Sequence, residues 1–389
     1  MPVRNRFAQL KNEIQAWRRD LHEHPELNFD TIRTAGIVKE RLHEFGCDLV
    51  ETGIGRTGVV GLIHGRQRSS SRTVGLRADM DALPIKENTG LPYASRHEGK
   101  MHACGHDGHT AMLLGAARYL CETRNFNGTV AVVFQPAEEG GGGGLEMVKD
   151  GMMDRFGIDE IYGMHNMPGM DIDAFAIRPG PFFASADIFR IDVSGVGGHA
   201  AQPHLGTDTT LVGCHIVVAL QTIISRVVNP RTPAVLSVTS FETDTTAYNV
   251  IPQSLRLKGT VRVLDADARK LIARKLDSVA TGIADAFGAS AKVTFTKGYP
   301  VMVNSETETE YAAQAARRVS PKVDDTAELI MGAEDFSFML NERPGAYILV
   351  GNGDTARVHN PNYDFNDDAI PYGCSWWVEV AENRLPLAG

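Results

Sequence analysis

The stretch that decides the fold runs from residue 129 to residue 149 and reads T-V-A-V-V-F-Q-P-A-E-E-G-G-G-G-G-L-E-M-V-K. Residues 129–134 are β-branched or apolar, which predicts a buried strand, and residues 145–149 favour a short helix. Two adjacent glutamates, Glu138 and Glu139, lie between them with a run of glycines. A strand that passes into a helix through a polar loop is the repeating unit of an α/β fold.

The same alternation continues on both sides of this stretch. Short apolar runs predict further strands at 59–63, 74–76, 161–164 and 346–350, and helical patterns cover residues 10–21, 31–45, 106–120 and 376–382. This order predicts an α/β domain with a mixed, largely parallel sheet and helices on both of its faces.

The pattern changes near residue 183. Strands and helices are expected in the order β-α-β-β-α-β, at 188–193, 207–228, 235–241, 255–263, 267–287 and 292–296, which is the order of a ferredoxin-like α+β unit. The chain has 389 residues, more than the ~250–300 over which one core usually grows. We therefore predict a catalytic domain in two segments, 1–182 and 298–389, and an inserted domain at 183–297.

Composition excludes some classes of function. The chain is 43% apolar and 22% charged, and its net charge of -9 disfavours nucleic acid as a partner. No apolar run approaches the ~18–20 residues of a membrane span, and the first residues lack the apolar core of a signal peptide. The five cysteines are scattered and contain no C-x-x-C pair. These features predict a cytoplasmic protein with free thiols and no membrane partner.

Residues of metal-ligand type gather where the predicted strands end. They are Asp79 and Asp81, then Cys104, His106, Asp107 and His109, then Glu138 and Glu139, then His165, and finally His359. A glutamate pair alone is usually solvated, a lone buried histidine is usually satisfied by the core, and a lone buried thiol is usually inert. In an open α/β sheet, however, ligands bind at the carboxyl ends of the strands. The coincidence of these residues at one edge therefore predicts a metal site.

Thiolate, imidazole and carboxylate ligands together suit Zn, Mn, Co or Ni. Two such ions that bridge one water lower the pKa of that water towards ~7. Attack on an amide carbonyl also needs a base, and two adjacent glutamates can divide the work, one binding metal and the other moving the proton. The run from Gly140 to Gly144 either lets the backbone pass close to a ligand or forms a flexible turn.

These motifs, in this order, resemble the hippurate hydrolase and N-acyl-L-amino acid amidohydrolase family, which is related to the metallo-aminoacylases and carboxypeptidases. The resemblance covers nearly the whole chain, from R-R-D-L-H-E-H-P-E-L through R-A-D-M-D-A-L-P, H-A-C-G-H-D-G-H, Q-P-A-E-E-G, G-M-H-N, G-G-H-A-A-Q-P-H, Y-N-V-I-P and M-G-A-E-D-F to H-N-P-N-Y-D-F. It implies two divalent metal ions per subunit. It also implies hydrolysis of the amide bond of a small N-acyl-L-amino acid, which releases a carboxylate and a free amino acid.

The resemblance further implies the roles of individual residues. Glu138 is the expected general base, and the expected metal ligands are Cys104, His106, Glu139, His165 and His359. Other branches of the superfamily have a metal-binding histidine where this chain has Asp79. Asp81 is therefore the better candidate for orienting the base.

The inserted domain is expected, again from the resemblance, to act as a lid and to form a homodimer. A histidine of that domain, here His199, is expected to reach the partner's active site and stabilise the tetrahedral oxyanion. Asn249 is the expected substrate contact. The acyl group and the amino acid of the substrate stay open.

Two other functions are compatible with parts of the sequence. Cys104 at a helix start suits the nucleophile of a cysteine hydrolase, but that function leaves Glu138, His165 and the other ligand-type residues unexplained. A metal-binding protein without catalysis is the third possibility, and the intact Glu138 speaks against it.

Overall fold

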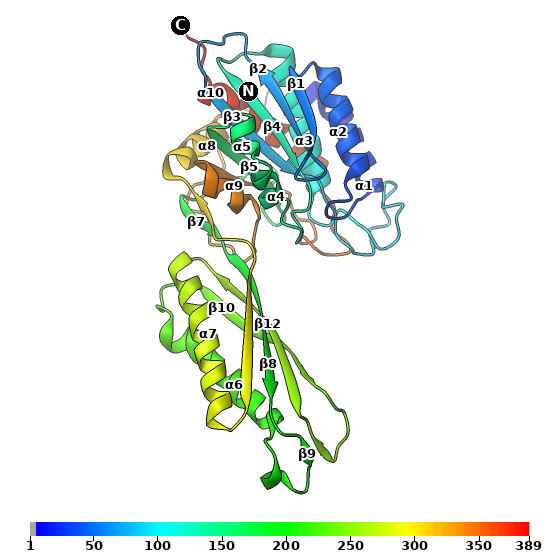
Figure 1. Ribbon diagram of the computed structural model, residues 1–389. Helices are drawn as coiled ribbons and strands as arrows, with labels where there is room; N and C mark the ends of the chain where they lie inside the picture. Colours follow the sequence, from blue (N-terminus) through cyan, green and yellow to red (C-terminus); the bar gives the residue numbers. More distant parts are fainter. Residues whose placement is uncertain (1–4, 389) are drawn as a thin grey trace. The chain divides into compact units, whose positions relative to one another are not determined.

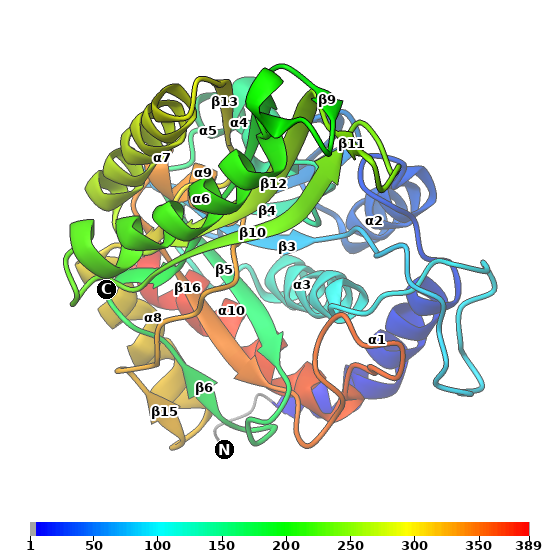
Figure 2. The same cartoon turned by 90° about the horizontal axis from the view of Figure 1, so that it is seen from below.

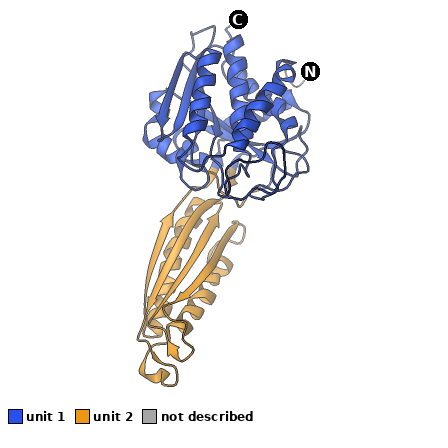
Figure 3. Ribbon diagram, turned by 90° about the vertical axis from the view of Figure 1, so that its right-hand side faces the viewer, with its two compact units in different colours: residues 1–180, 303–328, 335–389 blue, residues 181–302, 329–334 orange. Residues whose placement is uncertain are grey.

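The computed structural model describes residues 5–388, which form two compact units (Figure 3). Unit 1 contains the described residues up to Gly180, then 303–328 and those from Asp335 onwards. Unit 2 contains residues 181–302 and 329–334.

Unit 1 is built on an eight-stranded sheet with the order β1-β2-β4-β3-β5-β16-β6-β15. Its strands are β1 (Leu49–Ile54), β2 (Gly58–His64), β3 (Thr73–Asp79), β4 (Thr129–Gln135), β5 (Glu160–Met167), β6 (Phe175–Ala176), β15 (Val323–Asp324) and β16 (Gly345–Gly351). The four central strands, β4, β3, β5 and β16, are parallel, whereas β1–β2, β2–β4 and β6–β16 are antiparallel pairs. The predicted mixed, largely parallel sheet is confirmed.

Helices cover both faces of this sheet (Figures 1 and 2). One face carries α1 (Asn5–Glu23), α2 (Ile32–Phe45), α3 (His106–Thr123), α8 (Glu306–Val319) and α10 (Ile370–Arg384). The other face carries α4 (Gly143–Lys149), α5 (Met152–Arg155) and α9 (Phe336–Glu342). Helix α3 packs against α1, α2 and α10, which fixes the helix that begins at His106.

The local sequence explains these elements. All seven residues of β3 are buried, as expected for a parallel strand covered on both faces. The apolar residues of α1 that recur at helical spacing, from Leu10 to Leu21, are buried. Helix α2 ends at Gly46, whose φ of 81° places it in the left-handed conformation that glycine adopts without strain.

Unit 2 has the predicted β-α-β-β-α-β order. Its elements are β8 (Ser185–Ser194), α6 (Thr209–Thr222), β10 (Ala234–Thr243), β12 (Ser254–Val263), α7 (Ala266–Ala286) and β13 (Ser290–Lys297). They form an antiparallel sheet with the order β10-β12-β8-β13, which confirms the ferredoxin-like fold. The first and last strands, β8 and β13, are neighbours, with Asp187 opposite Lys297.

Shorter elements complete the chain. They are β7 (Gly180–Phe183), β9 (Gly198–His199), β11 (Val250–Ile251), β14 (Met302–Asn304), two 3-10 turns (Pro203–Leu205 and Asp367–Ala369) and a π turn (Ile223–Val227) that continues α6. The sequence analysis did not predict α8, although Glu306 and Glu308 in its first turn and Arg317 and Arg318 in its last match the helix dipole.

One helical stretch of the described chain, Thr209–Val227, is long and apolar enough to cross a membrane. It comprises α6 and the π turn. Val212, Ile216 and Leu220 lie in the core of unit 2, whereas Leu211 and Val218 on the same helix are exposed.

The central strand β16 gives a test of the fold. Ile348 is 0% exposed in β16, so Ile348→Ala should lower the free energy of unfolding of unit 1 by about 2–5 kcal/mol through lost burial and a cavity. All three tryptophans, Trp17, Trp376 and Trp377, belong to unit 1, so urea unfolding followed by tryptophan fluorescence measures this unit. The matched control is Ile32→Ala, because Ile32 is 72% exposed. Equal losses of unfolding free energy in Ile348→Ala and Ile32→Ala would contradict the assignment of the core.

Candidate metal centre

The parallel strands bring the ligand-type residues to one edge of the sheet of unit 1. β3 ends at Asp79 and leads to Asp81, and β4 ends just before the turn with Glu138 and Glu139. The strand predicted at 161–164 was expected to end at Met164, and this boundary was wrong. β5 continues to Met167 because it pairs with β16 up to Gly351, so His165 lies inside the strand.

The side chains at this edge converge. Cys104 Sγ lies 3.2 Å from His165 Nε2, and His359 Nε2 lies 3.2 Å from Glu139 Oε1. Three overlapping groups each have their ligand atoms within 4.8 Å of one another: Cys104, His106 and His165; Cys104, Glu139 and His359; and His106, Glu138 and Glu139. Each group is small enough to surround one ion, and each shares members with another.

Hydrogen bonds fix the tautomers of two of the histidines. His106 Nδ1 lies 2.8 Å from the carbonyl oxygen of Asp81, and His165 Nδ1 lies 2.6 Å from that of Asn166. Because a carbonyl only accepts, each Nδ1 is the donor, and Nε2 is the ring nitrogen left to face the site. His106 Nε2 is buried and has no hydrogen-bond partner among residues 5–388. A divalent cation would satisfy this atom, so the site fits a metal.

His109 belongs to the same motif but is not available as a ligand. Its Nδ1 lies 2.6 Å from Asp79 Oδ1, and its Nε2 accepts the backbone N–H of Asn166 at 2.9 Å. Asp79 in turn accepts a hydrogen bond from Arg77 at 2.8 Å. His109 and Asp79 therefore connect α3, the end of β3 and β5, which carry or adjoin the ligand-type side chains.

Asp81 acts on the backbone of the glutamate turn. Its two carboxylate oxygens accept the backbone N–H groups of Glu138 at 2.9 Å and of Glu139 at 3.1 Å. The side chain is 1% exposed, so these bonds are shielded from water. The carboxylate thereby sets the direction in which both glutamates leave the turn.

The sequence analysis missed Asn166 and Tyr363. Asn166 Nδ2 donates to the carbonyl oxygen of Cys104 at 2.6 Å, and the Tyr363 hydroxyl donates to Asn166 Oδ1 at 2.7 Å. Both residues stand in motifs that the sequence shows, G-M-H-N and H-N-P-N-Y-D-F, but only the fold reveals that they fix the loop of Cys104.

Carboxylates dominate the electrostatics of the site. Burial lowers the pKa of His106, but the charges of Asp79 and Asp81 outweigh it and raise this pKa to about 10. Burial also keeps the pKa of His165 well below its usual range, together with the nearby His109. His165 is therefore a neutral imidazole, and the negative charge around His106 favours a cation there.

Comparison with known proteins gives the family. Residues 75–383 match the profile of Peptidase family M20/M25/M40. The chain belongs to this family. It is 39% identical to the hippurate hydrolase of Campylobacter jejuni over 97% of this chain and 98% of that protein. It is 40% identical to the N-acyl-L-amino acid amidohydrolase of Geobacillus stearothermophilus over 92% and 96%.

The M20 fold is also present in a solved structure of a dinuclear metal binding peptidase from Bacillus subtilis. The two chains superpose with a TM-score of 0.86 at 33% identity, over 97% of this chain and 99% of the other. The resemblance inferred from the motifs is confirmed, and the chain is a member of a hydrolase family.

In this M20 chain Cys104 does not have the surroundings of a self-activated nucleophile. Burial and the charge of Glu139 raise the pKa of its thiol well above the usual value. A catalytic thiolate needs the opposite environment. A bound cation would deprotonate the same thiol by coordination, so the environment favours a ligand role.

The other two residues implied by the resemblance lie in unit 2. His199 is in β9 and pairs with Val250 of β11, and the backbone N–H of Ala200 donates to the carbonyl oxygen of Asn249 at 3.0 Å. His199 and Asn249 are therefore exposed neighbours, His199 in β9 and Asn249 in the turn just before β11.

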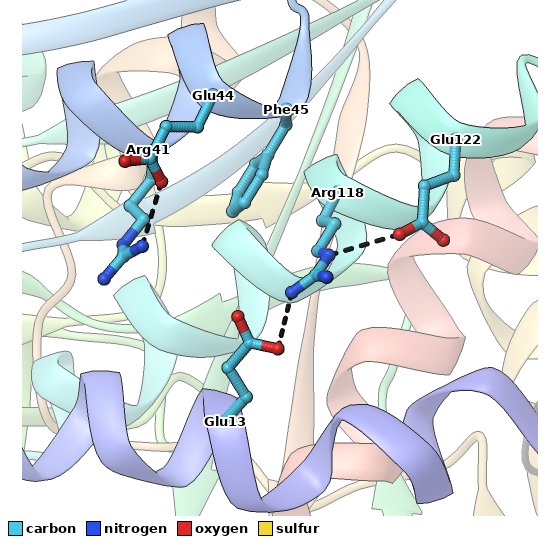
Figure 4. Close-up of a pocket in the computed structure, with 6 residues that line it drawn as sticks. All are labelled: Glu13, Arg41, Glu44, Phe45, Arg118 and Glu122. Atoms are coloured by element: carbon cyan, nitrogen blue, oxygen red, sulfur yellow. Dashed lines mark hydrogen bonds and ion pairs between the residues drawn. The ribbon is translucent and has the colours of Figure 1, made fainter.

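A separate surface pocket of about 290 Å³ lies between α1, α2 and α3 (Figure 4). Arg118 dominates it, with ion pairs to Glu13 at 2.7 Å and Glu122 at 3.2 Å. Arg118 lies 12 residues after His106 in α3, which is ~18 Å along the helix axis. The charges of this pocket are paired with each other, so it is a solvated surface feature.

Asp107, next to His106, belongs to a buried network with α1. Its Oδ2 lies 2.8 Å from His22 Nδ1, and His22 Nε2 lies 3.3 Å from Glu87. Burial lowers the pKa of His22, but the hydrogen bonds to Asp107 and Glu87 outweigh it and raise this pKa to about 9. The network ties α1 to the first turn of α3.

This shift predicts a pH dependence of stability. The pKa of His22 is higher in the folded state than the ~6.5 of an unfolded chain, so its contribution is fully present below pH 6.5 and is lost as the pH rises through about 9. In His22→Gln the loss of unfolding free energy between pH 6.5 and pH 9.5 should be smaller than in the wild type by up to about 3 kcal/mol. Urea unfolding followed by tryptophan fluorescence measures it, with the exposed His97→Gln as control. Identical slopes in wild type and His22→Gln would refute the assignment.

Proposed function

We propose that this chain is a dinuclear metal-dependent amidohydrolase that cleaves N-acyl-L-amino acids, such as hippurate or N-acetyl amino acids. The observation that carries the proposal is the buried Nε2 of His106, which has no hydrogen bond among residues 5–388 and is surrounded by thiol, imidazole and carboxylate groups next to Glu138. The names of the related enzymes, a hippurate hydrolase and an N-acyl-L-amino acid amidohydrolase, support this substrate class.

The proposed metal ligands are Cys104, His106, Glu139, His165 and His359. Cys104 and Glu139 each belong to more than one of the overlapping groups, which supports two neighbouring ions that share ligands. The mixed set of sulfur, nitrogen and oxygen donors suits Mn, Zn, Ni or Co. Ions bound there would supply Lewis-acid polarisation of the amide carbonyl and a water of lowered pKa.

Glu138 is the proposed general base and acid. Its carboxylate lies within 4.8 Å of the ligand atoms of His106 and Glu139, and its side chain is 7% exposed. Through its carboxylate oxygen it would accept a proton from the attacking water and return it to the leaving nitrogen. Asp81 keeps it in place through the backbone.

His199 is the proposed oxyanion-stabilising residue and Asn249 the proposed substrate contact. Both are exposed and adjacent, as expected for side chains that act on a ligand rather than on their own core. Replacement of either should lower turnover without changing the number of metal ions bound.

We also propose a homodimer that forms through unit 2. Leu211 is 48% exposed and Val218 70% exposed on α6, and β10 is an edge strand of its sheet. A second copy of the chain could bury these apolar side chains and pair with the edge strand through the same surface. A mass of one subunit in solution would contradict this. The free thiols, which include the neighbouring pair Cys47 and Cys121, support a reducing, cytoplasmic location.

Metal removal tests the proposed function. The purified protein, stripped with a chelator, should lose hydrolysis of hippurate and N-acetyl-L-cysteine, and Mn, Zn, Ni or Co should restore it, because the ions supply the activated water. Release of the free amino acid is the measurement. Turnover that survives removal of all metal would refute the proposal.

The adjacent glutamates give a matched pair of variants. Glu138→Gln should lower kcat by about 10²–10⁴-fold, because general acid–base catalysis contributes that much, while metal content stays at the wild-type level. Glu139→Gln should instead lose bound metal, as measured by elemental analysis after dialysis. Loss of metal in Glu138→Gln, or full metal content in Glu139→Gln, would reverse the two roles.

A further inference from the structure

We propose that Asp335 is a positioning residue that clamps the turn with Glu138 and Glu139 at both of its ends. This inference rests on the proposed function, because it assigns Asp335 a part in catalysis through the proposed base. Asp335 lies in M-G-A-E-D-F, a motif to which the sequence analysis gave no role.

The geometry is that of a single carboxylate that spans a loop. Asp335 Oδ1 accepts from Gln135 Nε2 at 2.7 Å, and Asp335 Oδ2 accepts from the backbone N–H of Gly144 at 2.8 Å. Gln135 is the last residue of β4, and Gly144 is the second residue of α4. Residues 136–143, which include both glutamates, are therefore closed by one side chain. The backbone N–H of Asp335 also points to Glu138 Oε1, at 3.4 Å.

The turn needs such a clamp because its backbone is strained. Ala137 has a φ of 55°, which residues other than glycine rarely adopt. Gly143 is so close to Pro136 that a Cβ would lie 1.7 Å from the carbonyl oxygen of Pro136. Strain of this kind persists only where surrounding contacts determine the conformation more than once. Asp81 holds the middle of the turn, and Asp335 holds its two ends.

Arg77 connects the clamp to the ligand side of the site. Its NH2 group donates to Asp335 Oδ1 at 3.1 Å, and its NH1 group donates to Asp79 Oδ2 at 2.8 Å. Asp79 in turn holds His109. All three charged side chains are 0% exposed, so the bonds are not weakened by water. The guanidinium thus fixes the ends of β3 and β4 relative to each other.

Replacement of Asp335 by asparagine distinguishes the hydrogen bonds of the Asp335 side chain from its contribution to core packing. The two side chains have nearly the same shape, but asparagine has one acceptor oxygen and one NH2 donor group. In either orientation its NH2 group faces a donor, the N–H of Gly144 or those of Gln135 and Arg77. Asp335→Asn should therefore release one end of the turn while the core around it stays filled.

The experiment combines hydrogen exchange with kinetics on hippurate. In Asp335→Asn the amides of the 136–144 segment, which are those of Ala137 to Gly144 because Pro136 has no N–H, should exchange at least about 10-fold faster, since the local opening becomes easier, while those of β3 and β5 keep their rates. kcat should fall about 10–100-fold, as is usual when a supporting partner of a site is lost, while KM stays within about three-fold. A residue with a merely structural role would change exchange throughout unit 1.

Asp187 provides a matched control. It is a 1% exposed aspartate that holds Arg269 at 2.8 Å and the backbone N–H of Gly298 at 3.0 Å, all within unit 2. Asp187→Asn should leave exchange in residues 136–144 unchanged. A second variant, Gln135→Met, removes the bond to Asp335 at the β4 end together with the bonds of Gln135 to Arg77 and Pro136, but keeps the bond of Asp335 to Gly144. It should also accelerate exchange of the same segment, and it replaces Asp335→Asn in the experiment if that variant does not fold.

The outcomes are distinguishable. Wild-type exchange of residues 136–144 in both variants would overturn the clamp. Faster exchange with an unchanged kcat would overturn its part in catalysis. Faster exchange in a protein whose wild type hydrolyses no N-acyl amino acid would support the clamp and refute the proposed function instead.

Discussion

Parallel strands that are buried on both faces are mostly apolar and carry most of their polar side chains at or near their ends, and this constraint organises the whole of unit 1. β4, β3, β5 and β16 are filled with apolar residues because helices cover both faces of the sheet. Their carboxyl ends meet at one edge, where the chain changes to polar loops. Residues far apart in sequence, such as Asp81 and His359, therefore belong to the same site.

Around that edge, hydrogen bonds from neighbouring groups hold most of the ligand-type side chains or the loops that carry them. Backbone carbonyls orient His106 and His165, Asn166 fixes the loop of Cys104, and two aspartates hold the glutamate turn. Such buried polar networks are rigid when every member is satisfied and costly when one is lost. His106 Nε2, which has no hydrogen-bond partner among residues 5–388, is informative, because an unsatisfied buried atom in such a network indicates what the site is built to bind.

Much of this was predictable from periodicity and from motifs. The sheet, the ferredoxin-like order and the gathering of ligand-type residues follow from short-range patterns, since strands and the loops after them are local in sequence. Asn166 and Asp335 were not predictable, because their roles depend on hydrogen bonds to Cys104 and Gly144, which are distant in the chain. The end of β5 was placed too early because its last residues pair with β16, a contact that no local pattern reveals.

The neighbouring positions of β8 and β13 have a consequence for how the chain closes on itself. Paired antiparallel strands lie ~5 Å apart, so the points where the ferredoxin-like segment begins and ends are adjacent, with Asp187 opposite Lys297. The entropic cost of closing a loop grows with the number of flexible residues in it. Because the folded segment brings its own two ends together, it costs the rest of the chain about as much as a short hairpin loop and not as much as a hundred disordered residues. Once this segment has folded, it joins the two flanking parts of the chain as a short connection would. An insert of any size can be accommodated on the same terms, provided that its first and last strands are neighbours.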